Sequence, residues 1–383
     1  MENALSGEYD AIVVGLGGMG SAALFHLVKR GYKVLGLEQF TLSNEMGSSH
    51  GLTRIIRLAY YEHPSYVPLV MRAYQLWQEL EFEAGNRLLH VTGSIDAGSP
   101  TSTVFEGSRK SCELYGLLHE VLTSAQISAR FPGYQLPPDY VANFQPGGGF
   151  LEPERCIQAY LSLAGGRGAV LHAEERVIDW SPSRGRVRVR TTRGSYETGR
   201  LIIAAGAWVS KLVPELAGVA VPERQVLAWL TPLEPELFLP SRFPVFNLAV
   251  EEGRYYGLPA FGIPGFKVGR YHHREEVVDP DTIDRNCYPE DEAVLRDFTR
   301  RYFPRANGET VQLKACMFTN TTDEHFLIDF HPEFPQVIVA SPCSGHGFKF
   351  ASVVGEIVAD LVHTGASRHD ISLFRLRKQA PKF

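Results

Sequence analysis

A run near the start of the chain, Gly15-Leu16-Gly17-Gly18-Met19-Gly20, has the GxGxxG spacing of a dinucleotide-binding turn. Gly15 permits a tight turn, Gly17 lets a pyrophosphate approach the backbone, and Gly20 lets the following helix pack close to a strand. The free N–H groups and the positive dipole end of that helix would face the pyrophosphate. Glu38 follows about 20 residues later, where a carboxylate can accept hydrogen bonds from an adenosine ribose. The pattern predicts a dinucleotide site, disfavours NADP and does not separate FAD from NAD.

The segments around this turn predict a βαβ unit. Ala11–Val14 and Val34–Leu37 are apolar strands, and Ser21–Lys29 between them has the apolar spacing of a helix. A strand, a glycine-rich turn and a helix recur near the other end of the chain, as Val337–Ala340 and a helix from Phe348 to about Leu361. We therefore predict one nucleotide-binding domain that is assembled from segments far apart in the sequence.

The middle of the chain has a different character. Proline, aromatic and β-branched residues are frequent over Pro222–Gly269, which is typical of an antiparallel sheet. The fold class is therefore α/β (α+β overall), with a Rossmann-like FAD-binding domain and an inserted antiparallel-sheet substrate domain. Other expected elements are helices over Pro64–Phe82 and from Pro153, and strands over Val187–Arg190 and Tyr196–Ala204. The expected segments are 1–85, 150–215 and 317–383 for the first domain, and 86–149 and 216–316 for the second.

The composition narrows the functional classes. Hydrophobic residues make up 44% of the 383 residues, charged residues 21%, and the net charge is -5, which gives no reason to expect nucleic acid or an anionic membrane as partner. The N-terminus lacks a signal-peptide pattern, and no apolar stretch approaches a membrane span. The cysteines are few and scattered, without a CxxC pair, so we expect no disulfide framework, no metal site and a cytoplasmic location. They are Cys112, Cys156, Cys287, Cys316 and Cys343.

Three further segments are more specific. The first is the run 47–57, with sequence GSSHGLTRIIR, and the second joins Tyr255-Tyr256-Gly257-Leu258-Pro259 to Gly265-Phe266-Lys267-Val268-Gly269. The third joins the run 316–321 (CMFTNT) and the run 323–326 (DEHF) to the run 344–349 (SGHGFK). Together, in collinear order along nearly the whole chain, they resemble the monomeric sarcosine oxidase and N-methyl-tryptophan oxidase family, which includes pipecolate oxidases.

The resemblance implies a role for each matching residue. Cys316 matches the cysteine that forms a thioether to the flavin 8α-methyl carbon, and His50 and Arg54 match residues against one flavin face. Arg57 and Lys349 match the pair that grips the substrate carboxylate, and Lys267 matches the lysine associated with O2 reduction. The active-site positions implied near the substrate are Tyr60, Tyr256 and His346, and the further FAD contacts are Ser48, Val177, Gly206, Gly345 and Gly347.

The chemistry of these residue types agrees with those roles. An arginine and a lysine together make a good carboxylate clamp, and a buried cation stabilises charge that develops on oxygen. Taken singly, each residue also has an ordinary explanation: an isolated cysteine is usually a small packed residue, and Arg54 and Arg57 have the spacing of one helix face. Tyr255 and Tyr256 alternate in a strand, so at most one points into a pocket. We interpret His325 and Cys343 as structural.

The chain departs from the family pattern in the specificity pocket. Phe318 replaces a tyrosine, Asn247 falls where a methionine is usual, and Leu258 replaces a phenylalanine, a loss that would leave room for a bulkier substrate. One extra residue after Lys267 leaves either Tyr271 or His272 at the position of a pocket histidine. These changes put sarcosine itself in doubt and leave the reaction type intact.

The resemblance therefore implies a flavin-dependent oxidase of N-methyl or other secondary-amine amino acids. FAD is the expected cofactor, covalently bound through Cys316. The expected partners are a small amino acid and O2, and the expected state is a monomer. Two alternatives stay open: an imino-acid oxidase acting on pipecolate or proline, and a flavin dehydrogenase that passes electrons to an acceptor other than O2.

Overall fold

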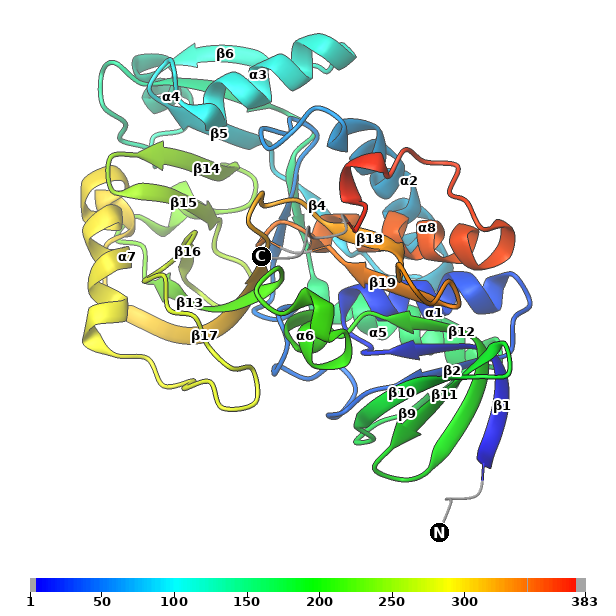
Figure 1. Ribbon diagram of the computed structural model, residues 1–383. Coiled ribbons are helices and arrows are strands. Elements are labelled where there is room, and N and C mark those ends of the chain that lie inside the picture. The colour runs from blue at the N-terminus through cyan, green and yellow to red at the C-terminus, as the bar shows by residue number, and fades with distance from the viewer. Residues whose placement is uncertain (1–4, 343, 377–383) are drawn as a thin grey trace, which may run out of the picture.

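The computed structural model describes residues 5–342 and 344–376. Two eight-stranded sheets lie side by side, and each is packed against its own helices (Figure 1). A small sheet of three strands, in the order β3-β8-β4, belongs to neither. Its strands are β3 (Arg54–Ile56), β4 (Leu89–Val91) and β8 (Gly149–Leu151).

The first sheet has a parallel centre, in the order β9-β2-β1-β12-β19. β18 pairs antiparallel with β19, and the antiparallel ribbon β10–β11 joins the start of β12. The strands are β1 (Leu5–Val14), β2 (Val34–Leu37), β9 (Val170–His172), β10 (Val177–Ser183), β11 (Arg186–Thr191), β12 (Ser195–Ile203), β18 (Leu327–Phe330) and β19 (Val337–Ser341). All eight strands begin and end within the segments that we expected from the sequence for the first domain.

Helices cover one face of this sheet, because their apolar stripes and the sheet share one hydrophobic core. They are α1 (Gly18–Lys29), α2 (Tyr66–Ala84), α5 (Pro153–Gly166) and α8 (Ala351–Thr364). The other face packs against the β10–β11 ribbon and α6 (Val209–Leu212). The indole Nε1 of Trp77 on α2 donates to the carbonyl oxygen of Lys349 at 2.8 Å, so this core also positions the segment in front of α8.

The second sheet has the order β17-β13-β16-β15-β14-β5-β7-β6 and is antiparallel except where β14 pairs with β5. The antiparallel sheet expected over Pro222–Gly269 is thus confirmed. Its strands are β5 (Ser94–Gly98), β6 (Glu120–Thr123), β7 (Val141–Gln145), β13 (Val221–Leu230), β14 (Val245–Val250), β15 (Gly253–Leu258), β16 (Phe266–Arg270) and β17 (Thr310–Asn320). The helices beside it are α3 (Thr103–Tyr115), α4 (Ser124–Arg130) and α7 (Pro289–Tyr302). The 3-10 turns of the chain are η1 (Gly206–Trp208), η2 (Pro214–Leu216), η3 (Pro235–Phe238), η4 (Pro304–Ala306), η5 (Phe348–Phe350) and η6 (Ser372–Phe374).

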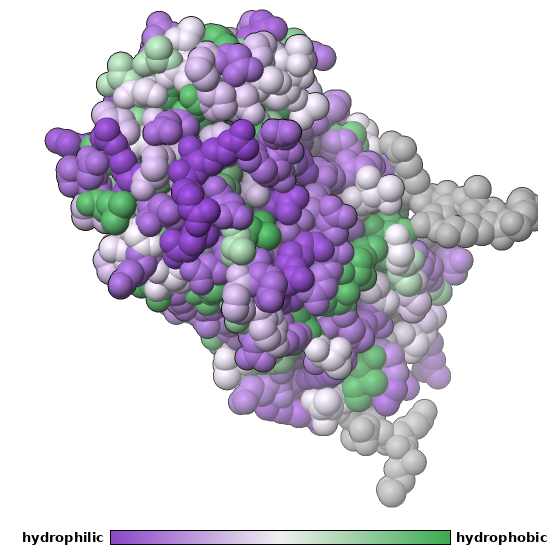
Figure 2. Space-filling view, turned by 90° about the vertical axis from the view of Figure 1, so that its left-hand side faces the viewer, coloured by the Kyte–Doolittle hydropathy of each residue, from purple (hydrophilic) through white to green (hydrophobic). Residues whose placement is uncertain are grey.

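The two faces of the second sheet differ in chemistry because successive strand residues point to opposite sides. One face is apolar and packs on α7, with Phe246 and Tyr255 against Phe298. The outer side of α7 carries charged residues, and the surface on that side of the molecule is mainly hydrophilic (Figure 2). The opposite face of the sheet is polar yet buried, and by the strand register it carries Asp96, Asn143, Asn247, Tyr256, Lys267, Cys316 and Phe318.

The expected elements are present with small shifts at their ends, such as α2 beginning at Tyr66 instead of Pro64. The division into two domains stays a prediction. Strand β17 runs across the expected limit between residues 316 and 317, since it pairs with β13 along nearly its whole length.

Among residues 5–342 and 344–376, no helix is long and apolar enough to cross a membrane, and no cluster of His, Cys, Asp and Glu is arranged to hold a metal. Cys343 lies outside the described residues.

Candidate active site

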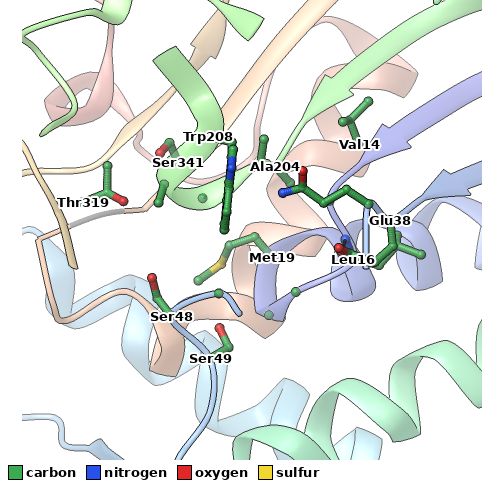
Figure 3. Close-up of a pocket in the computed structure, with 18 of the residues that line it drawn as sticks. Val14, Leu16, Met19, Glu38, Ser48, Ser49, Ala204, Trp208, Thr319 and Ser341 are labelled. Carbon is green, nitrogen blue, oxygen red and sulfur yellow. Dashed lines mark hydrogen bonds between the residues drawn. The ribbon is translucent and has the colours of Figure 1, made fainter. Parts of the chain in front are cut away.

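A long cleft of about 410 Å³ runs along the carboxyl edge of the first sheet. Val14, Leu37, Ala204 and Ala340 lie at or near the carboxyl ends of four parallel strands and line it, which is where α/β sheets bind ligands. Glu38 lies toward one end of the cleft and Thr319 toward the other, with Ser48 and Ser49 on a loop between them (Figure 3). The cleft thus reaches from the glycine-rich turn to the polar face of the second sheet.

The glycine-rich turn fits tightly at two positions. Gly15 has φ +86, and a Cβ there would lie 2.6 Å from the carbonyl oxygen of Ala204. A Cβ on Gly20 would lie 1.7 Å from the carbonyl oxygen of Gly15, so only glycine lets α1 start this close to β1. A Cβ on Gly17 would have open space around it, on the side where the cleft lies.

Glu38 is held at the wall of this cleft. One carboxylate oxygen accepts the N–H of Leu16 at 2.9 Å, and the other accepts the N–H of Phe40 at 3.1 Å. Burial raises the pKa of Glu38, and these backbone N–H groups act against that rise. The carboxylate lines the cleft and only accepts hydrogen bonds, which suits a ligand with hydroxyl groups.

Most cofactor-binding residues expected from the sequence line the cleft. They are Gly15, Gly17, Glu38, Ser48, Arg54, Val177, Gly206, Gly345 and Gly347. Gly20, His50 and Cys316 are not among the lining residues. Neither ring nitrogen of His50 has a hydrogen-bond partner among the described residues, and burial, followed by repulsion from Arg54, lowers the pKa of His50 to about 2.

A second, small cavity of about 40 Å³ adjoins the cleft, since Arg54, Phe318, Gly345 and Phe348 line both. Of the expected active-site residues, Arg57, Tyr256, His346 and Lys349 line the small cavity, whereas Tyr60 and Lys267 do not. Tyr256 faces it while Tyr255 stacks on Phe298, which confirms that only one of the two tyrosines points into a pocket. With Arg54 and Tyr271, three cations, a histidine and two tyrosines thus converge beside the cleft.

Arg57 is almost fully buried and lies between two carboxylates. Its Nη2 contacts both carboxylate oxygens of Glu62, at 2.9 and 2.8 Å, and its Nε lies 3.8 Å from Asp96 Oδ1. Although burial acts in the opposite direction, Arg57 lowers the pKa of Glu62 to about 2. Burial raises the pKa of Asp96 to about 6, with Arg57 acting against the rise. The helix-face interpretation of the Arg54–Arg57 spacing is wrong, since Arg54 lies in strand β3 and Arg57 follows it directly.

Lys349 is the second buried cation of the small cavity. Its Nζ donates to the carbonyl oxygen of His346 at 2.8 Å, and burial, followed by repulsion from Arg57, lowers its pKa to about 7. His346 Nε2 lies 2.9 Å from the carbonyl oxygen of Glu324, so this nitrogen carries the proton, and Nδ1 accepts from the Tyr60 hydroxyl at 2.5 Å. Burial lowers the pKa of His346 to about 4, which keeps the ring neutral.

Lys267 lies on the polar face of the second sheet, behind the loop that carries Thr53. Its Nζ donates to the carbonyl oxygens of Gly51 and Thr53 at 2.6 and 2.8 Å, and to Thr53 Oγ1 at 3.1 Å. Burial, followed by repulsion from Arg54, lowers the pKa of Lys267. Three oxygen acceptors nevertheless match the three N–H bonds of an ammonium, whereas a neutral amine has only two. The geometry therefore favours the charged form.

Cys316 is buried on β17 beside Arg54. Its Sγ lies 3.9 Å from Arg54 Nη2 and 3.9 Å from the carbonyl oxygen of Ser48. Because Arg54 and Ser48 both line the cleft, the thiol lies just behind the cleft wall.

The structure decides between Tyr271 and His272. Tyr271 lines the small cavity, whereas His272 turns away, with Nδ1 2.9 Å from Glu223 Oε2 and Nε2 3.1 Å from Glu324 Oε1. The room expected from Leu258 is not present, because Phe318, Tyr256 and Tyr271 also line the cavity and about 40 Å³ remains. The expectation of a roomier pocket is therefore wrong for this structure.

The imidazole of His272 between two carboxylates predicts a pH-dependent contribution to stability. Hydrogen bonds to Glu223 and Glu324 raise the pKa of His272 to about 9. This contribution is present in full below the unfolded-state pKa of roughly 6.5 and is lost as the pH rises through about 9. Since the group is half-exposed, we discount it to ~1 kcal/mol. His272→Gln should lower the melting temperature by about 1–2 °C at pH 6 and leave it unchanged at pH 10. An equal loss at both pH values would contradict this assignment.

Sequence reasoning missed Glu62 and Asp96, the two carboxylates beside Arg57. Glu62 follows Arg57 by five residues in an irregular loop, and no periodicity marks it. Asp96 reaches the site through the parallel pairing of β5 with β14, whose sequences lie far apart. Thr319 and Trp208 also line the cleft, and no pattern in the sequence marked either residue individually as part of the site.

A family model described as "FAD dependent oxidoreductase" matches residues 10–361, which includes both ends of the cleft. The chain belongs to this family. A monomeric sarcosine oxidase of Bacillus sp. (strain NS-129) is 42% identical over 384 residues, covering 99% of each chain. An N-methyl-L-tryptophan oxidase of Yersinia pestis (strain Pestoides F) is 33% identical over 374 residues, covering 97% of this chain and 99% of the relative. These relatives confirm the resemblance drawn from the motifs.

The fold of this FAD-dependent oxidoreductase also matches solved structures. NikD, described as an unusual amino acid oxidase essential for nikkomycin biosynthesis, superposes in its open form with a TM-score of 0.84. The match covers 98% of this chain and 99% of NikD at 26% identity. The predicted fold class is confirmed.

The residues present fit FAD. The cleft is long, begins at the glycine-rich turn and Glu38, and ends at buried polar groups of the second sheet. Thr319 Oγ1 is buried at that end without a hydrogen-bond partner among the described residues. Because buried polar groups are normally paired, this hydroxyl indicates that a ligand with polar atoms completes the site.

Proposed function

We propose that the protein is an FAD-dependent oxidase of small secondary-amine amino acids, acting as a monomer in the cytoplasm with O2 as acceptor. The observation that carries the proposal is the pair of buried cations, Arg57 and Lys349, in a small cavity that adjoins the FAD cleft. The relatives named as sarcosine and N-methyl-L-tryptophan oxidases support the secondary amine. Residues 1–85, 150–215 and 317–383 would bind the cofactor, and residues 86–149 and 216–316 would form the substrate domain.

When bound, FAD accepts a hydride from a carbon next to the amine nitrogen and passes two electrons to O2, so that an imine, which water hydrolyses, and H2O2 are formed. Gly15, Gly17 and Glu38 would hold its adenosine and pyrophosphate end. Arg54, Gly345 and Gly347 would lie at the flavin end, beside the small cavity.

Arg57 and Lys349 would bind the substrate carboxylate and so orient the amine. Within the described contacts, Arg57 Nη1 donates once, to the carbonyl oxygen of Ala59 at 2.6 Å, and Lys349 Nζ donates once, to His346. One N–H of Arg57 Nη1 and two N–H bonds of Lys349 Nζ therefore remain free to bind a substrate carboxylate. That carboxylate would compete with Glu62 for the guanidinium of Arg57. His346 and Tyr60, both uncharged, would position Lys349 through the His346 carbonyl oxygen.

Lys267 would supply the positive charge that favours electron transfer to O2. Its ammonium is fixed by three oxygen acceptors and lies in a water-poor interior, where such a charge acts strongly. This role also favours an oxidase over a dehydrogenase.

Cys316 would bind FAD covalently through a thioether to the 8α-methyl carbon. We expect the yellow flavin to stay with the polypeptide after denaturation in SDS or acid, because a thioether survives both. In Cys316→Ala the flavin should be released. Cys156→Ala is the matched control, since Cys156 is equally buried but lies in α5. Release of the flavin from the denatured wild-type protein would contradict covalent attachment.

The proposal is tested by measuring peroxide from the purified protein with sarcosine, N-methyl-L-alanine, N-methyl-L-tryptophan, pipecolate and proline, with glycine as the primary-amine control. We expect peroxide from at least one small secondary amine and far less from glycine. The small cavity predicts that N-methyl-L-tryptophan is a poor substrate. Turnover restricted to the cyclic amino acids would favour the imino-acid oxidase, and no turnover with any secondary amine would overturn the proposal.

A further inference from the structure

A row of polar side chains crosses the buried face of the second sheet and ends at the small cavity. Asn143 on β7 is opposite Asp96 on β5, which is opposite Asn247 on β14, which is opposite Tyr256 on β15. Residues directly opposite in neighbouring strands share one face, so the four side chains are neighbours. Asn247 and Tyr256 line the cavity, and Asp96 and Asn143 lie behind them.

Asp96 fixes the orientation of the Asn247 amide. Asn247 Nδ2 donates to Asp96 Oδ1 at 2.9 Å, and because a carboxylate accepts only, the amide nitrogen must point to Asp96. The amide oxygen then points the other way. Its one described partner is the Tyr271 hydroxyl at 3.5 Å, which is the limit of a hydrogen bond.

This oxygen is a buried acceptor on the cavity wall. Asn247 is 2% exposed, and it lines the cavity together with the apolar side chains of Leu258 and Phe318. Of the three cations at the cavity, Arg57 and Lys349 are assigned above to the substrate carboxylate, and Arg54 donates to the carbonyl oxygens of Ser48 and Thr53. An apolar substrate group against Asn247 Oδ1 would leave the acceptor buried and poorly paired, whereas a hydroxyl group would donate to it.

We propose that Asn247 is a specificity-determining residue that selects secondary-amine amino acids with a small hydroxylated side chain, and that Asp96 positions it. The inference rests on the proposed function and narrows its substrate class. The cavity of about 40 Å³ admits a hydroxymethyl group and excludes an indole. A hydroxylated substrate should therefore be preferred over an apolar substrate of equal size by roughly 10-fold or more.

The test compares kcat/KM for N-methyl-L-serine with that for N-methyl-L-2-aminobutyrate, which has a methyl group in place of the hydroxyl. We expect a ratio of about 10 or more for the wild-type enzyme and a ratio near 1 for Asn247→Leu. Asp96→Asn should lower the ratio only in part, because the Asn247 amide can then turn, and a hydroxyl can accept from its NH2 as well as donate to its oxygen. A wild-type ratio near 1 with active turnover would overturn this inference and leave the proposed function standing.

Binding gives a second measurement that needs no turnover. The dissociation constants of 3-hydroxypropionate and butyrate, two carboxylates with equal numbers of heavy atoms, are measured from the shift of the flavin absorbance. The wild-type enzyme should bind 3-hydroxypropionate roughly 10-fold more tightly than butyrate. Asn247→Leu should bind the two carboxylates with equal affinity. Equal affinities in the wild-type enzyme would overturn the inference, even if a variant failed to fold or no amine were oxidised.

Discussion

Replacing Lys267 with methionine should slow the reaction of the reduced enzyme with O2 by roughly 100-fold or more, as expected when a fixed charge is removed from a water-poor site. Reduction by the substrate under anaerobic conditions should slow by less than about 10-fold, because Lys267 does not line the small cavity. Methionine has nearly the length of lysine and no charge, so the change removes the ammonium and its three hydrogen bonds to Gly51 and Thr53. The two half-reactions are measured separately by stopped-flow absorbance.

Lys314→Met is the matched control. Lys314 also lies on a strand of the second sheet, but it pairs with Glu45 and is partly exposed. Its loss should change neither half-reaction by more than about 2-fold, as expected for an exposed ion pair. If Lys267→Met slowed flavin reduction and flavin reoxidation by the same factor, Lys267 would have no specific role in the reaction with O2.

Replacing Arg57 with methionine should lower kcat/KM for a carboxylate-bearing amine by roughly 10²–10³-fold, since a buried, hydrogen-bonded charge pair is worth about 2–5 kcal/mol. The free energy of unfolding should fall as well. Glu62 and Asp96 would lose the cation between them, and an unpaired buried carboxylate is costly. Steady-state kinetics at equal flavin content and a thermal melt give the two readouts.

Arg57→Lys separates charge from geometry at this position. It keeps the positive charge but cannot contact both oxygens of Glu62 as the guanidinium does, so we expect an intermediate loss of kcat/KM and a smaller loss of stability. A fall of less than about 3-fold in Arg57→Met would contradict the clamp.

The parts of the site that were predictable from the sequence are those that local rules determine. The turn at Gly15–Gly20 and the acid at Glu38 follow from the geometry of one βαβ unit, and the structure places both on the cleft. The apolar stripe of α2, with Val67, Trp77 and Leu80 buried, follows from helical periodicity in the same way.

The parts that depend on pairing between distant strands were not predictable. Asp96 belongs to the site because β5 pairs with β14 in parallel, and no local pattern encodes that register. Tyr271 and His272 could not be separated, because a shift of one residue at the end of a strand exchanges the two faces. The cavity volume depends on how Phe318, Tyr256 and Tyr271 pack together, which residue types alone do not determine.

Amine oxidation with O2 as acceptor can be tested in a single anaerobic experiment with the purified holoenzyme. Sarcosine or the best secondary amine from the peroxide assay is added without O2, the flavin absorbance is followed, and air is then admitted. We expect the amine to bleach the flavin, O2 to restore the absorbance rapidly, and one H2O2 to form for each flavin reoxidised. Bleaching that O2 does not reverse would show a dehydrogenase, and no bleaching by any secondary amine would overturn the proposed function.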